Sequence, residues 1–378
     1  MIDMKKDNKK VETGLNEGNL IRWQEAEIED FQHRILTWYK GNRREMPWRE
    51  DPSPYRIWIS EIMLQQTRVD TVIPYFNSFM ERYPTVESLA SSDEDELMKY
   101  WEGLGYYSRI RNIRETAINI VSNYGGQIPE SYDELLKLKG IGEYTAGAIA
   151  SEAFGQKVPA VDGNVFRVFA RLTAKEDDLR DLKFQKQLKE AVKSILPQDE
   201  TGDFNQGLIE LGALICIPKG SPKCGLCPVK ELCLSNKLNL QDRIPVKSKA
   251  KQRTVQEKTV FILQYGDKFA VRKRDDQNLL AGLFEIPNVE GFYTADEAKT
   301  VIEEMGFVVS DLHVLKDRKV VFTHIEWILQ GYYVHVKNDH EQYIFETKEN
   351  LVQKYTLATA FREYLNLMEE PQQLSLEF

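Results

Sequence analysis

Two carboxylates, Glu61 and Asp162, lie in sequence surroundings that predict chemistry. Glu61 belongs to the segment YRIWISEIMLQQT, whose apolar residues cover nearly all sides of a helix, so the helix should be buried. Burial raises the pKa of a carboxyl group and keeps it protonated near neutral pH. Asp162 directly precedes an amphipathic helical pattern, GNVFRVFARL. A protonated Glu with an ionised Asp is the pairing that breaks a glycosidic bond.

Each carboxylate also has an ordinary structural interpretation. Glu61 could form a buried salt bridge, with Arg49 or Arg44 as the partner. Asp162 is in the position of a helix N-cap, where Asp is a preferred residue. Capping and catalysis are compatible for Asp162, because a capping carboxylate is held rigidly at the start of its helix.

All four cysteines fall within 18 positions, in the pattern C-x7-C-x2-C-x5-C. Clustered cysteines in a reducing compartment are metal ligands more often than disulfides. Thiolates select zinc or iron–sulfur clusters. Zinc knuckles usually have two C-x2-C pairs, and this chain has one, so the pattern favours a structural [4Fe–4S] cluster over a four-cysteine zinc site. The predicted ligands are Cys216, Cys224, Cys227 and Cys233.

The segment KLKGIGEYTAGAIA, residues 137–150, predicts two helices joined by a tight turn at Gly140 and Gly142. We expect residues Leu135–Leu138 to form the end of the first helix, and the second helix to start at Thr145. The N-terminus of the second helix would present N–H groups and a helix dipole to one phosphate. A lone G-x-G is usually just a turn, but the flanking helical patterns indicate a helix-hairpin-helix.

The overall composition is that of a globular protein without a membrane anchor. The 378 residues are 42% hydrophobic and 29% charged, and no apolar run is long enough for a membrane span. The N-terminus has charge but no apolar core, so we expect no signal peptide and a cytoplasmic location. The net charge of −9 argues only mildly against a polyanionic partner, because an acidic protein can carry a basic face.

The pattern of apolar residues divides the chain into successive parts. Periods of three and four residues predict an all-α, two-lobed domain over residues 25–240, after a disordered tail at 1–24. Residues 241–258 predict a basic linker, either a solvated connector or a segment that follows DNA. Residues 259–367 predict an α+β domain, and residues 368–378 a free tail.

Within the α+β domain, several elements can be predicted. One hairpin should turn at Gly266-Asp267, and two further strands should meet around Gln330-Gly331. Two helices are expected, over residues 295–306 and 357–368.

Four motifs in this order resemble one family. WISEIMLQQT, LKGIGEYTAGA, VDGNVFRV and the cysteine loop are together similar to the helix-hairpin-helix DNA glycosylases of the endonuclease III superfamily, and most of all to its adenine glycosylase (MutY) branch. The resemblance covers roughly residues 30–236 and, more loosely, the C-terminal domain. The first cysteine gap has seven residues, where the family has six. The extra residue falls in IPKGSPK, a loop that can absorb it.

The resemblance implies a function for the carboxylates. An adenine would be flipped out of the duplex, Glu61 would protonate it at N7, and Asp162 would stabilise or attack the oxocarbenium-like sugar before water completes hydrolysis. Tyr144 and Asn164 would assist at the sugar. The base pocket would contain Arg44, Trp48, Arg49, Leu64 and Gln206. Bifunctional relatives have a lysine nucleophile at the position of Tyr144, so this enzyme should be monofunctional.

The resemblance also implies that the enzyme acts on adenine opposite 8-oxoguanine or guanine in double-stranded DNA, as a monomer. Residues expected to fill the gap and grip the oxidised base are Gln66, Thr67, Leu104 and Tyr106. The alternative is that the two tyrosines of GLGYYSR are ordinary half-buried aromatic residues with no role in DNA binding.

The C-terminal domain resembles a Nudix domain, but the paired acidic cluster of the Nudix box is missing. The family's Phe-Ser-His loop corresponds to Phe322-Thr323-His324, where the Thr hydroxyl can bond N7–H and O8 of the lesion. The alternative to lesion reading is that Thr323 and His324 are simply a pair of polar residues at the end of a strand.

The last residues, Gln373–Phe378, resemble a bacterial sliding-clamp motif, with Glu377 as a departure from it. Two other functions compete with adenine excision. One is a related glycosylase for mismatched thymine or uracil, against which the pocket residues and the C-terminal domain argue. The other is a non-catalytic lesion binder, against which Glu61 and Asp162 argue.

Overall fold

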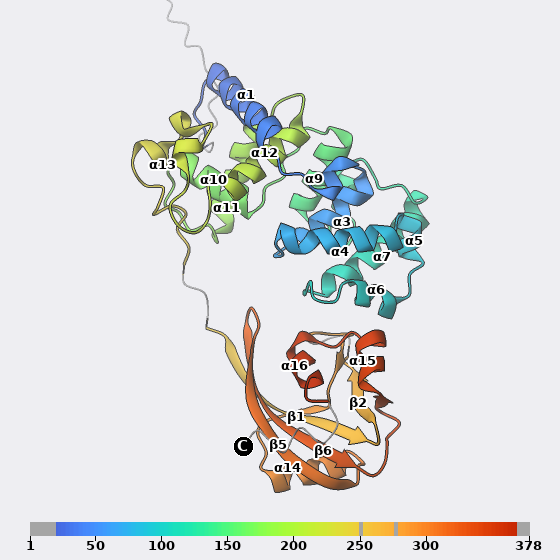
Figure 1. The fold of residues 1–378 in the computed structure, drawn as a ribbon. Coiled ribbons are helices and arrows are strands. Elements are labelled where there is room, and N and C mark those ends of the chain that lie inside the picture. The colour runs from blue at the N-terminus through green and yellow to red at the C-terminus, as the bar shows by residue number, and fades with distance from the viewer. Residues whose placement is uncertain (1–19, 249–251, 276–278, 369–378) are drawn as a thin grey trace, which may run out of the picture. The chain divides into compact units, whose positions relative to one another are not determined.

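The computed structural model describes residues 20–248, 252–275 and 279–368 (Figure 1). The chain forms two compact units. Among the described residues, the first contains residues 20–62 and 128–248, and the second contains residues 63–127, 252–275 and 279–368. Over the part of the chain that is described, no helix combines the length and the apolar character needed to cross a bilayer.

The first unit is helical and packs around a small aromatic centre. Phe31 lies between Phe169 and Phe204, with ring centroids 6.5 and 6.1 Å away and the rings edge to face. These rings come from three different helices, so they tie together the scaffold of the unit. Its α-helices are α1 (Glu25–Asn42), α2 (Pro47–Glu50), most of α3 (Pro54–Leu64), α8 (Tyr132–Leu135), α9 (Glu143–Phe154), α10 (Gly163–Leu172), α11 (Leu182–Ser194), α12 (Thr201–Leu214) and α13 (Leu234–Lys237).

One glycine sets how closely α12 approaches α10. A Cβ atom at Gly212 would lie 2.5 Å from the Cβ atom of Asn164, which is closer than two carbons can pack. The absence of a side chain at Gly212 therefore lets α12 pass directly behind the first turn of α10.

The second unit joins four helices to a sheet. The helices are α4 (Val69–Arg82), α5 (Val86–Ala90), α6 (Glu94–Tyr100) and α7 (Ser108–Tyr124). Phe79 packs against Tyr83 and Trp101, with ring centroids 5.2 and 6.4 Å away. Polar contacts connect these helices to the sheet domain, including an ion pair of 2.7 Å between Lys273 and Asp95.

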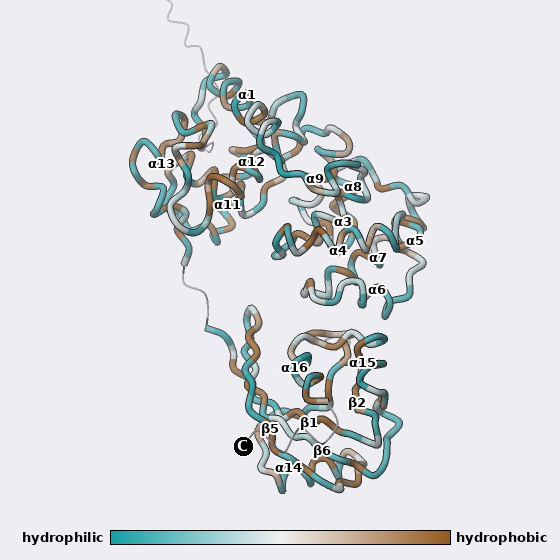
Figure 2. The backbone as a smooth tube through the Cα atoms, in the orientation of Figure 1, coloured by the Kyte–Doolittle hydropathy of each residue, from teal (hydrophilic) through white to brown (hydrophobic). Residues whose placement is uncertain are grey.

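Over the described residues of this domain, the sheet has seven strands, in the order β3-β2-β1-β6-β5, with β4 beside β1 and β7 beside β2. The central strands β1 and β6 run parallel, and β5 is antiparallel to β6. Hydrophobic stretches mark both central strands in Figure 2, and β1 is buried over seven consecutive residues. The strands are β1 (Thr254–Tyr265), β2 (Lys268–Lys273), β3 (Phe284–Glu285), β4 (Asn288–Glu290), β5 (Val309–Val321), β6 (Ile325–Val336) and β7 (Ile344–Glu346). The domain also contains α14 (Ala295–Glu304), α15 (Lys348–Lys354) and α16 (Arg362–Leu365).

Several predicted elements are confirmed and some are wrong. The hairpin at Gly266-Asp267 and the helix within residues 295–306 are present. The predicted turn at Gln330-Gly331 is wrong, because β6 runs straight through these residues and the turn lies at residues 322–324. Glycine in that strand provides room instead, since a Cβ at Gly331 would lie 3.1 Å from side chains of Leu315 and Tyr364.

Helix ends also differ from the prediction. The helix after the glycine turn begins at Glu143, two residues before the predicted Thr145, and α8 ends at Leu135 rather than at Leu138. Within the expected helix 357–368, a 3₁₀ turn at Thr359–Phe361 leads into the short α16. Strand β1 begins at Thr254, inside the segment 241–258 that was expected to be a linker.

Candidate active site

The burial predicted for Glu61 is confirmed. Helix α3 leaves only 5% of the residue exposed, and the Tyr144 hydroxyl donates a hydrogen bond of 2.5 Å to its carboxylate. Burial raises the pKa of Glu61 to about 7, more strongly than the bond from Tyr144 lowers it. Burial also raises the pKa of the Tyr144 hydroxyl well above its ordinary value, so this group remains a donor.

Asp162 is the N-cap of α10, as its sequence position predicts. Its Oδ1 accepts 2.8 Å hydrogen bonds from the backbone N–H groups of Asn164 and Val165, and Oδ2 accepts one of 2.7 Å from the Asn164 side chain. Burial raises the pKa of Asp162, and these three donors oppose the rise. Arg167 in turn donates a 2.7 Å hydrogen bond to Asn164 Oδ1, which fixes the orientation of the amide.

Glu61 does not form the salt bridge with Arg44 or Arg49 that its sequence position suggested. Arg44 and Arg49 both pair with Glu210 of α12, each at 2.9 Å, and Glu210 is completely buried. Two cations thus neutralise a carboxylate that the sequence analysis did not single out. Glu61 keeps the hydroxyl of Tyr144 as its neighbour and stays protonatable near neutral pH.

The side chain of Gln206 connects this ion-pair cluster to a further carboxylate. Its Oε1 accepts a 2.5 Å hydrogen bond from Arg49, and its Nε2 donates one of 2.6 Å to Glu152 of α9. A hydrogen bond from Gln206 also lowers the pKa of Glu61. Among the other predicted pocket residues, Trp48 is 5% exposed in α2, and Leu64 is half-buried at the end of α3.

The glycine turn has the geometry that a hairpin requires. Gly140 has φ +79°, a left-handed conformation that favours glycine, and Gly142 is the N-cap of α9. The first turn of α9 therefore begins directly after the turn and supplies N–H groups that have no partner within the helix. The same turn carries Tyr144. The start of α9 therefore combines the predicted phosphate site with the hydroxyl that donates a hydrogen bond to Glu61.

In the second unit, one arginine fixes the two loops predicted to grip DNA. Arg109 of α7 is 8% exposed and donates hydrogen bonds of 2.7–3.1 Å to four backbone carbonyls, those of Met63, Gln65, Leu104 and Gly105. Its guanidinium group lies 5.2 Å from the ring of Trp101 and 5.6 Å from that of Tyr106. Both loops are thus tied to one buried cation.

Each of these loops contains a strained residue. Gln66 has φ +61° and Tyr106 has φ +48°, a region that non-glycine residues rarely adopt. Gln66 is exposed, and Tyr106 is 46% exposed, whereas Leu104 is buried. Thr67 is half-buried beside them. Strain of this kind is concentrated at functional sites, and the exposed residues offer surface to a ligand.

The predicted lesion-reading residues form the turn between β5 and β6. The Phe322 N–H closes this turn on the carbonyl of Ile325 at 2.8 Å, and the Phe322 ring packs 4.9 Å from that of Trp327. Thr323 and His324 are exposed. The Thr323 hydroxyl lies 3.2 Å from the Tyr106 hydroxyl, within hydrogen-bonding distance. The structure therefore places two separately predicted DNA-facing groups side by side.

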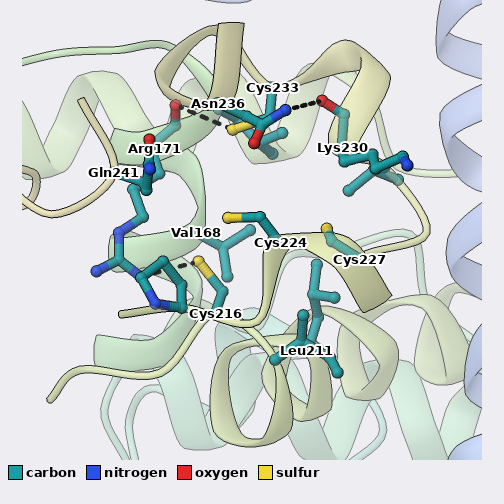
Figure 3. Close-up of a pocket in the computed structure, with 14 residues that line it drawn as sticks. Val168, Arg171, Leu211, Cys216, Cys224, Cys227, Lys230, Cys233, Asn236 and Gln241 are labelled. Atoms are coloured by element: carbon teal, nitrogen blue, oxygen red, sulfur yellow. Dashed lines mark hydrogen bonds between the residues drawn. The ribbon is translucent and has the colours of Figure 1, made fainter. Parts of the chain in front are cut away.

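The four cysteines line one cavity of about 30 Å³, together with apolar side chains of α10 and α12 (Figure 3). All four thiols are free, and Arg171 donates a 3.2 Å hydrogen bond to Cys216 Sγ. In the described part of the chain, no three Cys, His or acidic side chains are gathered closely enough to hold a single metal ion. The thiols therefore surround a shared space without converging on one point.

Sequence reasoning missed Arg109, Glu152 and Glu210. The two glutamates had the same signal as Glu61, a carboxylate within a mostly apolar helical segment, IASEAF and LIELGAL. Arg109 had no comparable signal, because YYSRIRNI contains several positive charges and none stands out.

Comparison with known proteins defines the class. Residues 59–194 match the HhH-GPD superfamily of base excision DNA repair proteins, and residues 259–367 match the NUDIX domain. A solved thermostable thymine-DNA glycosylase is 31% identical, with a TM-score of 0.51, and the match covers 56% of this chain and 98% of that one. Fold and site thus define a helix-hairpin-helix DNA glycosylase of base excision repair.

The curated relatives define the family. The adenine DNA glycosylase of Buchnera aphidicola subsp. Schizaphis graminum is 38% identical over 69% of this chain and 75% of its own length. The human adenine DNA glycosylase is 41% identical over 58% of this chain and 42% of its own. The chain belongs to the adenine DNA glycosylase family, the MutY branch predicted from its motifs, and is a DNA glycosylase.

Proposed function

We propose that this enzyme hydrolyses the N-glycosidic bond of adenine opposite 8-oxoguanine, and opposite guanine, in duplex DNA. The observation that carries the proposal is the contrast between two neighbouring carboxyl groups of one unit. Glu61 is buried with a pKa of about 7. Burial also raises the pKa of Asp162, but three N–H hydrogen bonds oppose that rise and favour its ionised form. One is suited to be an acid, the other to stabilise positive charge.

In the proposed mechanism, the adenine leaves the stack and enters the pocket around Glu61. Glu61 donates its proton to N7, so that the base departs as a neutral molecule. The Tyr144 hydroxyl then hydrogen bonds to the carboxylate left on Glu61. Asp162, oriented by Asn164, stabilises the oxocarbenium-like sugar until water attacks. With tyrosine at position 144 in place of a lysine, no Schiff base forms there and an abasic site remains.

Recognition of the opposite base falls to the second unit. The hydroxyls of Tyr106 and Thr323 lie together on an exposed surface. Thr323 can bond N7–H and O8 of 8-oxoguanine, whereas guanine offers an acceptor at N7. Gln66 and Tyr106, both in strained loops held by Arg109, would fill the space that the adenine leaves. The contact between Tyr106 and Thr323 supports a single lesion-reading surface.

The four cysteines are proposed to hold a [4Fe–4S] cluster. The cysteine spacing, which contains a single C-x2-C pair, supports a cluster over a zinc ion. The four thiols also line one cavity. Its role would be to fold the loop 216–233 rather than to take part in hydrolysis. The proposed sliding-clamp motif, residues 373–378, lies outside the described residues.

A glycosylase assay on matched duplexes tests the proposal. Adenine would be placed opposite 8-oxoguanine, guanine or cytosine, and excision measured under single-turnover conditions. We expect activity greatest opposite 8-oxoguanine, and loss of activity with retained binding in Glu61→Gln. Greatest activity opposite cytosine, or excision of thymine from a mismatch, would overturn the proposal, and binding without excision by the unmodified protein would indicate a lesion sensor.

A further inference from the structure

A cavity in the sheet domain takes no part in the function proposed above. Its volume is about 450 Å³, which lies within the range of roughly 300–1,000 Å³ that is typical of small-ligand pockets. Its lining includes Lys258 of β1, Glu285 of β3 and Trp327 of β6, together with Arg274, which directly follows β2. The sheet domain thus contains a ligand-sized cavity with charged side chains in its wall.

Lys258 is the unusual residue of this cavity. It is 8% exposed, and its ammonium nitrogen lies 5.2 Å from the centre of the Trp327 ring. Among the described residues, no hydrogen bond or ion pair of this ammonium group is found. Burial lowers the pKa of Lys258, because the charged form is withdrawn from water. Burying a cation without a hydrogen-bond acceptor is costly, so an anion in the cavity would stabilise this side chain.

The buried part of the cavity wall has a surplus of positive charge. Glu285 is 3% exposed and pairs with Arg272, at 2.8 Å, and with Arg274. Two guanidinium groups therefore neutralise one carboxylate, and the buried lysine adds a third cation. Asp275 and Glu290 also line the cavity, but both are exposed, where water and salt screen their charge. The charge of the interior therefore suits an anion.

The wall of the cavity is held in place by its own hydrogen bonds. Trp327 donates a hydrogen bond of 2.7 Å from Nε1 to Gln256, and its ring packs 4.9 Å from that of Phe322. The amide of Asn288 donates a hydrogen bond of 2.9 Å to Glu285. These groups are in position before a ligand arrives, which reduces the free energy that binding spends on ordering side chains.

We propose that this cavity binds the phosphate group of a small phosphorylated molecule, with Lys258 as the principal contact. Lysine binds phosphate as a point charge with three donors. Because Lys258 is almost fully buried, a terminal phosphate can reach it, whereas a phosphodiester in a duplex is held at the surface of the DNA. The paired acidic cluster of the Nudix box is missing, so the proposed role is binding and not hydrolysis.

Isothermal titration calorimetry of the full-length protein with inorganic phosphate, at constant ionic strength, tests this site. Lys258→Met removes the ammonium group but keeps an unbranched apolar stem against Trp327. We expect saturable binding by the unmodified protein and binding weakened about tenfold or more in Lys258→Met, because a hydrogen bond to a charged group is lost. The matched control is Lys268→Met, which removes an exposed lysine from β2 and should leave the affinity unchanged.

Several results would overturn the proposal. These are the absence of saturable binding, equal affinity in Lys258→Met and the unmodified protein, and an equal loss in Lys268→Met. Titration with an undamaged duplex separates the two sources of phosphate. Duplex affinity should not change in Lys258→Met, and a parallel loss would assign the phosphate to DNA instead of a small molecule.

Two further points keep the test decisive. If circular dichroism shows that Lys258→Met is unfolded, Lys258→Gln replaces it, because glutamine keeps polar N–H donors without the charge. Phosphate affinity retained in Lys258→Gln would equally overturn the proposal. All of these measurements are made without adenine excision, so their outcome is independent of whether the proposed glycosylase function holds.

Discussion

The two units of this enzyme treat polar groups in opposite ways. In the first unit, Glu61 and Glu210 are buried, and hydrogen bonds and ion pairs hold their carboxyl groups in place. In the second, Tyr106 and Thr323 are exposed, and backbone strain and a buried arginine fix their position. Acid chemistry needs desolvation, which shifts a pKa, whereas recognition needs groups that a ligand can reach. The first unit is therefore expected to respond to pH and the second to changes in loop geometry.

The largest expected effect is on catalysis by Asp162. Asp162→Asn should lower the excision rate by about 10²–10⁴-fold, because the charge that stabilises the sugar is lost. The helix cap should survive, since Asn caps as well as Asp. Single-turnover kinetics and thermal unfolding would measure the two effects. Asp162→Ala is the comparison variant and should also lose about 1 kcal/mol of stability. Equal loss of stability in both would show that the charge itself holds the helix.

Substitution of Arg109 tests the second unit. Arg109→Met would remove the donor from four backbone carbonyls, two of them buried, and we expect a destabilisation of about 2–4 kcal/mol with weaker binding to lesion-containing DNA. The alkaline limb of the pH profile should not move, because the pKa of Glu61 is set by its burial and by groups of the first unit, such as Tyr144, and not by Arg109. Arg114→Met, on the same helix, removes a hydrogen bond of 3.1 Å to the carbonyl of Ser92 and is the control. A shifted pH profile in Arg109→Met would contradict the division between the units.

The hydroxyl of Thr323 should contribute a smaller, specific effect. Thr323→Val removes it at nearly constant volume, and we expect the preference for 8-oxoguanine over guanine to fall by about 3–10-fold, the value of one hydrogen bond. Thr323→Ser should retain the preference. The measurement is the ratio of excision rates on the two duplexes. Equal ratios for the Val and Ser variants would remove this hydroxyl from lesion reading.

The remaining expected effect is on stability rather than on activity, and its size depends on pH. The pKa of Glu61 is raised from 4.5 to about 7 by folding, so the folded state holds its proton more tightly than the unfolded state. Stability is therefore lost as pH rises from about 4.5 through about 7. Glu61→Gln, which cannot ionise, should unfold at a higher temperature than the unmodified enzyme at pH 8.5 but not at pH 4.5. Calorimetry at both values would check this, and a gain at pH 4.5 alone would contradict it.

The sequence predicted the surroundings of Glu61 and Asp162 better than the C-terminal sheet, for physical reasons. A charge inside an apolar helix, as at Glu61, is a local signal, and an Asp before a helix is another. The partner of Arg44 and Arg49 was not predictable, because Glu210 lies more than 160 residues away and only tertiary packing joins them. The turn at Gln330-Gly331 was predicted wrongly because glycine there makes room for neighbouring side chains within a strand.

The hydrogen bonds of Asp162 have an evolutionary consequence. Because the carboxylate accepts backbone N–H bonds that an amide oxygen can accept equally well, a single nucleotide change in its codon, from Asp to Asn, should silence excision and leave the fold intact. A protein that still grips the lesion without removing adenine would occupy the site and shield it from other repair. The capping hydrogen bonds that hold Asp162 in place would also hold an asparagine there. A single mutation can therefore produce a folded, inactive variant that still binds the lesion.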